Sequence, residues 1–226
     1  MTTLILAAHP DDEVLGCGGT IANLTQRGDG VAIAILGEGI TSRHARREDA
    51  DPKALRALQK RSLRAAKILG VNEVEFFNLP DNRFDTVPLL DVVKIVERLV
   101  AQYKPAMVFT QHGGDLNIDH AVLFRATLTA TRPMSASPVK ALYAYEVASS
   151  SEWAFQKFSP PFRPNHFVNI AGTLEKKIRA MQIYESEARP FPHPRSPEAL
   201  RAAAQHWGSV IGRPAAEAFE LVRQIV

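Results

Sequence analysis

Short apolar runs alternate with longer amphipathic stretches along most of the chain. The apolar runs are rich in aliphatic and β-branched residues, which is typical of strands covered on both faces of a sheet. We predict strands over residues 3–8, 31–36, 74–79, 106–110 and 141–145. Helical patterns lie between them, over residues 13–27, 53–69, 88–103 and 120–131. This alternation predicts βαβ units, and therefore an α/β, Rossmann-like three-layer αβα sandwich with a mostly parallel sheet.

The last third of the chain follows a less regular pattern and contains more proline. We predict a loop over 159–167, an amphipathic helix over 171–188, a helix over 196–212, and either a helix or a closing strand over 216–226. Ser196 and Pro197 suit the cap and the first position of a helix, because serine accepts backbone N–H groups and proline lacks one. No repeat or linker interrupts the sequence, so we expect a single domain over residues 1–226.

Composition narrows the classes of function. The chain has 226 residues, a formal net charge of +3 and a pI of about 9.1, and this small basic excess gives no sign of nucleic-acid binding. Cys17 is the single cysteine, so no internal disulfide can form, and we expect a cytoplasmic location. The first residues carry no basic leader, and no window approaches the roughly 20 apolar residues that cross a bilayer, so we expect no membrane insertion.

Two further segments have simple interpretations. The glycine-rich "GCGGT" (16–20) lacks the G-x-G-x-x-G spacing of a dinucleotide site and predicts close packing of a helix on the sheet. The charged "SRHARREDADPK" (42–53) leaves two interpretations open. It forms either a solvated surface or a lid whose arginines meet a phosphate on a ligand.

Four ionisable residues follow the first predicted strand in "HPDDE" (9–13). Ligands of open α/β sheets bind beyond the carboxyl ends of the strands, where this segment lies. His9 and Asp12 flank a strand-to-helix corner and can direct a nitrogen and a carboxylate oxygen to one ion. The segment "QHGGDLNIDH" (111–120) follows the fourth strand, holds two histidines and two aspartates, and is expected to supply a third ligand. Two histidines and one carboxylate, with one position left for water, form a catalytic zinc site.

The two segments also indicate a family. "AHPDDE" followed by "GDLNIDH" resembles the LmbE-like/PIG-L family of zinc-dependent N-acetylglucosaminide deacetylases. Comparable segments of the family match "GCGGT", "GEGITSR", "LPDNRFD" and "YESEARPFPHPRSPEA", so the resemblance covers most of the chain. It implies a metal-dependent amidohydrolase acting on an N-acetylated amino sugar.

The resemblance also implies roles for individual residues. The implied metal ligands, for Zn²⁺ or another divalent ion such as Fe²⁺, are His9, Asp12 and His120. Asp11 becomes the general base, and Glu13 would support the site without binding the ion. Arg43 and Asp81 match positions that contact the substrate sugar.

The implied reaction is hydrolysis of an amide, in which Asp11 takes a proton from the attacking water and the amine is protonated as it leaves. Many relatives carry a histidine three positions before the distal zinc histidine, where this chain has Asn117. Asparagine can donate a hydrogen bond to an oxyanion but cannot donate a proton. Two proton sources stay open: Asp11 acting a second time, which we favour, and His193 if its loop folds over the site. We expect Asp119 to orient a ligating histidine or Asp11.

We therefore predict a hydrolase that removes the N-acetyl group from an amino-sugar-containing small molecule, such as a nucleotide-linked sugar or a glycan precursor. Residues 146–226 are expected to complete the substrate cleft, with Trp153 and Phe155 as candidates for its lining. Two alternatives stay open. One is a deacetylase of a GlcNAc conjugate in low-molecular-weight thiol biosynthesis, and the other is a non-catalytic sugar- or nucleotide-binding module that retains the metal. Assembly into homo-oligomers also stays open.

Overall fold

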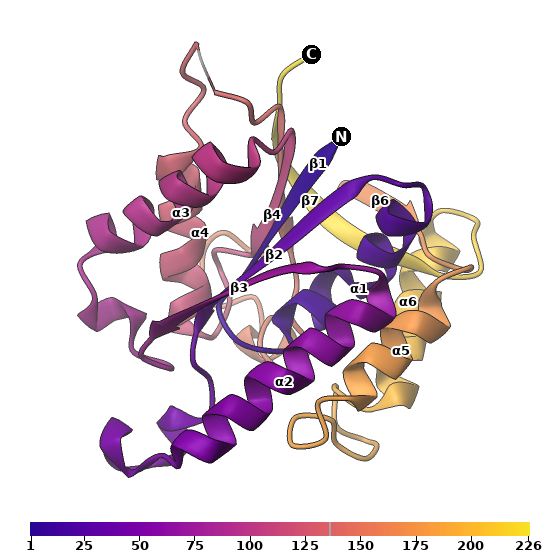
Figure 1. Ribbon diagram of the computed structural model, residues 1–226. Coiled ribbons are helices and arrows are strands. Elements are labelled where there is room, and N and C mark those ends of the chain that lie inside the picture. The colour runs from indigo at the N-terminus through magenta and orange to yellow at the C-terminus, as the bar shows by residue number, and fades with distance from the viewer. Residues whose placement is uncertain (136) are drawn as a thin grey trace.

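The computed structural model describes residues 1–135 and 137–226 and contains one seven-stranded sheet (Figure 1). The strands are β1 (Thr2–Ala7), β2 (Gly30–Gly37), β3 (Glu73–Leu79), β4 (Met107–Gln111), β5 (Ala141–Tyr145), β6 (His166–Asn169) and β7 (Ala216–Gln224). Their order in the sheet is β3-β2-β1-β4-β5-β7-β6. The first five strands are parallel, whereas β7 runs antiparallel to both of its neighbours, β5 and β6. The predicted α/β sandwich with a mostly parallel sheet is confirmed.

Within the described residues, six α-helices cover the two faces of the sheet (Figure 1). They are α1 (Asp12–Gln26), α2 (Pro52–Leu69), α3 (Leu89–Tyr103), α4 (Ile118–Ala130), α5 (Leu174–Gln182) and α6 (Pro197–Val210). Helices α3 and α4 pack on one face, and the other four pack on the opposite face. Because side chains alternate along a strand, Leu4 and Leu6 enter the core under α3 and α4, while Ile5 and Ala7 enter the core under α1.

The strand order creates a crevice at the carboxyl ends of β1 and β4. These strands are neighbours, with Leu4 opposite Val108, but the chain leaves them in opposite directions. From β1 it passes through α1 to β2, and from β4 it passes through α4 to β5. Such a point, where the strand order reverses, is where open α/β sheets bind their ligands.

The structure corrects the sequence prediction mainly in the last third of the chain. The helix expected over 171–188 is limited to α5, Leu174–Gln182, and the chain then turns back toward the crevice. The expected loop over 159–167 includes the start of β6 at His166. Residues 216–226, which fitted a helix or a strand, contain β7. The predicted cap at α6 is present, because the Ser196 hydroxyl accepts the backbone N–H of Ala199.

No helix in the described part of the chain is long and apolar enough to cross a membrane.

Close packing explains the glycine at the start of "GCGGT" and gives a stability prediction. A Cβ atom on Gly16 would lie 2.1 Å from the ring of Tyr145, which is fully buried and donates its hydroxyl to the Leu6 carbonyl. We expect Gly16→Ala to lower the free energy of unfolding by about 2–3 kcal/mol, measured by urea denaturation. Gly172→Ala is the control, since its Cβ would meet no atom within 4 Å. Equal stability of the two variants would contradict this packing argument.

Candidate metal centre and active site

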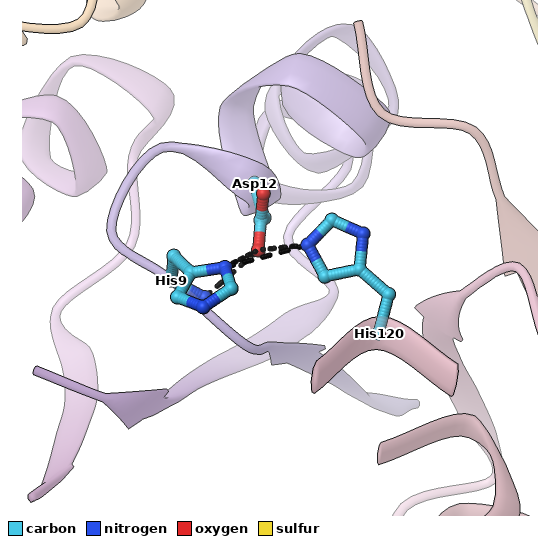
Figure 2. Close-up of side chains that lie close together, drawn as sticks. All are labelled: His9, Asp12 and His120. Carbon is cyan, nitrogen blue, oxygen red and sulfur yellow. Dashed lines mark hydrogen bonds and ion pairs between the residues drawn. The ribbon is translucent and has the colours of Figure 1, made fainter. Parts of the chain in front are cut away.

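Three side chains converge at the carboxyl edge of the sheet, at the crevice between β1 and β4. His9 follows β1, Asp12 begins α1, and His120 lies in the first turn of α4. Figure 2 shows that the three side chains point toward one another from these separate segments. Asp12 and His120 are buried, and His9 is partly exposed. The sequence-predicted ligands from the two distant segments are therefore brought together.

The spacing of the three donor atoms fits a small divalent cation. Asp12 Oδ2 lies 3.4 Å from His9 Nδ1 and 3.3 Å from His120 Nε2, and the two nitrogens are 3.4 Å apart. Ligands about 2.0–2.1 Å from a tetrahedral zinc ion lie roughly 3.3–3.4 Å from one another. The residues present thus fit a metal ion that His9, Asp12 and His120 would hold.

The electrostatics of this cluster favour positive charge. Burial lowers the pKa of His9, but its hydrogen bonds with Asp119 and Asp12 raise that pKa well above its usual range. Burial likewise opposes the charged form of His120, yet Asp12 and Asp115 raise its pKa to about 9. The pKa of Asp12 is held well below its usual range, because the two histidines outweigh the effect of burial. A divalent cation held among these groups would supply the positive charge that they favour.

Each histidine of the cluster has a carboxylate on the far side of its ring. His9 Nε2 lies 2.9 Å from Asp119 Oδ2, which leaves Nδ1 directed at the cluster. His120 Nδ1 lies 3.1 Å from Asp115 Oδ2, which leaves Nε2 directed there as well. Carboxylates in such positions fix the tautomer of a metal-binding histidine and raise its basicity. Asp115 is fixed in turn by the hydroxyls of Ser150 and Ser151.

Two carboxylates, those of Asp81 and Asp119, lie close to the Nε2 atom of His9. Asp81 Oδ1 lies 3.3 Å from Nε2 and could join Asp119 in binding a further cation. Both carboxylates are occupied, however. Asp119 accepts the backbone N–H groups of Asn82 and Phe84, and Asp81 accepts two donors from Ser42. The geometry therefore fits a hydrogen-bonded support for His9 rather than a second metal site.

Asp11 occupies a different position from the metal-facing groups. Its carboxylate is buried and accepts a 2.8 Å hydrogen bond from the guanidinium of Arg195, in the loop before α6. Burial raises the pKa of Asp11 well above its usual range, although the Arg195 charge lowers it. The backbone φ of Asp11 is 110°, in the region that L-residues rarely adopt, and this strain is characteristic of functional sites. Glu13 lies behind it, bonded to the Asp11 N–H and to the hydroxyl of Tyr184.

The three-residue cluster and Asp11 line a cleft of about 510 Å³, and we call this part of the lining the floor. Arg43, Asp81 and Asn117 also line the cleft, and we count them among its walls. Residues from the last third of the chain complete it, namely Ser149, Ser150, Trp153, Glu187 and Arg195. Arg43 contacts Glu187, which also lines the cleft: one guanidinium nitrogen of Arg43 donates to both carboxylate oxygens of Glu187, at 2.6 and 2.7 Å.

The structure places the two candidates for proton or oxyanion chemistry differently. Asn117 lines the cleft, caps α4 through its side-chain oxygen and donates an amide N–H to Asn82. His193 instead borders an adjoining hollow, where its ring packs edge-to-face on Trp153 and its Nδ1 accepts the backbone N–H of Arg195. The loop of His193 does reach the site, but it is Arg195 that contacts Asp11.

Sequence reasoning missed three residues that shape the site. Asp115 is one of the two aspartates in segment 111–120, and the sequence alone assigns it no role. Arg195 and Glu187 lie far along the chain from His9, Asp12 and His120. The spacing of Asp115 before His120 was one usable signal. The segment "YESEARPFPHPRSPEA", which resembles a family segment and contains both Glu187 and Arg195, was another, but it does not single out either residue.

The fold and the cluster together define a Rossmann-like α/β protein with a candidate two-histidine, one-carboxylate metal centre at the carboxyl edge of its sheet. Residues 4–131 match the model of the PIG-L family, described as GlcNAc-PI de-N-acetylase, and the chain belongs to that family.

Full-length comparisons agree with this assignment. The chain is 26% identical to the diacetylchitobiose deacetylase of Thermococcus kodakarensis, over 97% of this chain and 82% of the relative. It is 23% identical to the probable N-acetyl-alpha-D-glucosaminyl L-malate deacetylase 2 of Bacillus cereus, over 81% of this chain and 82% of the relative. The crystal structure of GalB, the 4-carboxy-2-hydroxymuconate hydratase of Pseudomonas putida, is similar in fold, with a TM-score of 0.78, 21% identity and coverage of 100% and 97%.

Proposed function

We propose that this protein is a metal-dependent hydrolase that removes the acetyl group from an N-acetylated amino-sugar-containing small molecule. One observation carries the proposal. Three donor atoms lie at the spacing of a tetrahedral metal site, and a buried acid that is not part of that site opens on the same cleft. A metal centre paired with a separate base is the arrangement needed to hydrolyse an unactivated amide.

His9, Asp12 and His120 would hold the ion, for which Zn²⁺ is the best match and Fe²⁺ an alternative. Such an ion lowers the pKa of water and polarises a carbonyl oxygen. Asp11 takes the proton of the water that attacks the acetyl carbonyl, and returns it to the nitrogen of the departing amine. Arg195 keeps the Asp11 carboxylate in one orientation through its 2.8 Å hydrogen bond.

The remaining polar groups of the cleft suit substrate positioning. Asn117 lines the same cleft and can offer its amide N–H to the developing oxyanion in place of its present partner, Asn82. Arg43 and Asp81 lie on the walls, where they can exchange their present partners, Glu187 and Ser42, for sugar hydroxyls. Glu13 and Asp119 support Asp11 and His9 from behind.

The choice of substrate is supported by the family and by the names of two relatives, a diacetylchitobiose deacetylase and a probable N-acetyl-alpha-D-glucosaminyl L-malate deacetylase. The substrate in the second of these names is a GlcNAc conjugate, which is the class of substrate named in the thiol-biosynthesis alternative. A nucleotide-linked sugar or glycan precursor and a cytoplasmic location stay predictions from the sequence. The rival class, a non-catalytic module that retains the metal, requires no base beside the ion, whereas Asp11 is present and held in place.

Release of acetate tests the proposal. We expect the zinc-loaded protein to release acetate from one or more members of a panel comprising N-acetylglucosamine, diacetylchitobiose, GlcNAc–malate and UDP-N-acetylglucosamine. Removing the ion with a chelator should lower the rate by at least about a hundredfold, because the chemistry then depends on side chains alone. Adding back zinc should restore it. Binding of a panel member without any acetate release would favour the non-catalytic module.

A further inference from the structure

Trp153 lies between the cleft and a second hollow. Its side chain is 42% exposed and lines both the 510 Å³ cleft and an adjoining hollow of about 570 Å³. The second hollow is otherwise formed by six consecutive residues, 189–194, in the loop between α5 and α6. The cleft that holds the candidate catalytic groups and the hollow over this loop therefore meet at Trp153.

The second hollow has a chemical character unlike that of the cleft floor. Its surface is formed by Trp153, Pro190, Phe191, Pro192 and Pro194, which we call the aromatic shelf, and Phe191 is 66% exposed. The polar side chains beside it are those of Arg189 and His193, and the Nδ1 atom of His193 already accepts the Arg195 N–H. The shelf thus offers apolar and aromatic faces with few groups to satisfy hydroxyls.

The aromatic shelf is held in place and linked to the catalytic floor. The ring of Trp153 packs edge-to-face on His193, with ring centroids 5.5 Å apart. Arg195, two residues further along, donates to Asp11 at 2.8 Å. The three prolines restrict the backbone of the loop, so little conformational entropy is lost when a ligand covers the shelf.

From these contacts we propose that the aromatic shelf binds a flat apolar group attached to the N-acetylated sugar. The preferred substrate is then an amino-sugar conjugate with an aryl or similarly apolar aglycone. This inference rests on the proposed function, since it assumes that the sugar occupies the cleft. A second sugar ring could stack its C–H face on Trp153 or Phe191, but an aryl group would cover more of this apolar surface, so we commit to the aryl aglycone.

The test compares N-acetylglucosamine with its phenyl β-glycoside as substrates of the zinc-loaded protein. We expect kcat/KM to be at least tenfold higher for the phenyl glycoside, mainly through a lower KM. Trp153→Ala should remove most of this preference, lowering kcat/KM for the phenyl glycoside at least fivefold more than for the free sugar. Phe155→Ala is the matched control, since Phe155 belongs to the same segment and is 73% exposed but does not line either hollow.

A binding measurement separates this inference from the proposed function. Calorimetric titration of the protein with phenyl β-glucosaminide, the deacetylated glycoside, needs no catalysis. Tight binding that Trp153→Ala weakens, in a protein that releases no acetate, would support the shelf and refute the deacetylase. Acetate release at the same kcat/KM from both substrates, unaffected by Trp153→Ala, would overturn the shelf and leave the deacetylase intact. A preference for diacetylchitobiose over the phenyl glycoside would also overturn it.

Discussion

Asp11→Asn is expected to lower kcat by about a hundredfold to ten-thousandfold, the usual contribution of a general base. The variant keeps the shape of the side chain and its contact with Arg195, because the amide oxygen can still accept a hydrogen bond. Asparagine also tolerates the positive φ of 110° at this position better than most residues. The fold should therefore persist, while the group that takes the proton is lost.

Two measurements make this prediction specific to the base. Metal content should stay near one ion per chain, since none of the three donor atoms belongs to Asp11. Asp91→Asn, which changes an exposed carboxylate of α3, is the control for the loss of one negative charge. Near-normal turnover by Asp11→Asn would show that another group accepts the proton. Loss of metal would show instead that Asp11 acts within the metal site.

The order of strands and helices could be predicted because each element carries its own local signal. The buried strands β1 and β2 are continuous apolar runs, and α2 begins with the Asp51 cap and Pro52 and ends before Gly70. Strand β6 has four residues, and its signal depends on pairing with β7 rather than on its own pattern. The helix predicted over 171–188 is longer than the observed α5, Leu174–Gln182. The residues "YESEA" continue the helical pattern in the sequence, but their contacts at the site end the helix before them.

The convergence of the three candidate metal-binding residues could be predicted for a related reason. His9, Asp12 and His120 follow the carboxyl ends of two strands, and the order of strands places those ends side by side. Arg195 and Glu187 reach the cleft only through the tertiary packing of the loop between α5 and α6. Their roles depend on side-chain contacts across more than a hundred residues of chain, as in the pairing of Arg43 with Glu187. No local pattern encodes such contacts.

His120→Ala is expected to have the other large effect, because it removes one of three ligands rather than the base. Only His9 Nδ1 and Asp12 Oδ2 would remain, and two donors hold a zinc ion far more weakly than three. We expect metal content after dialysis to fall below about a tenth of an ion per chain, and acetate release to fall with it. Elemental analysis measures the metal, and circular dichroism checks that the fold persists.

Two further variants in segment 111–120 serve as comparisons for the metal content of His120→Ala. Asp115→Asn keeps the ligating nitrogen of His120 but removes the carboxylate 3.1 Å from its other nitrogen, so metal affinity should fall about 10- to 100-fold. His112→Ala removes a buried histidine that contacts Pro160 and Glu220 instead of the cluster, so metal should be retained. The expected order of metal affinity is His112→Ala, then Asp115→Asn, then His120→Ala. If His120→Ala still carried one tightly bound zinc per chain, the ion would not be held by His9, Asp12 and His120 together, and the proposed metal site would be wrong.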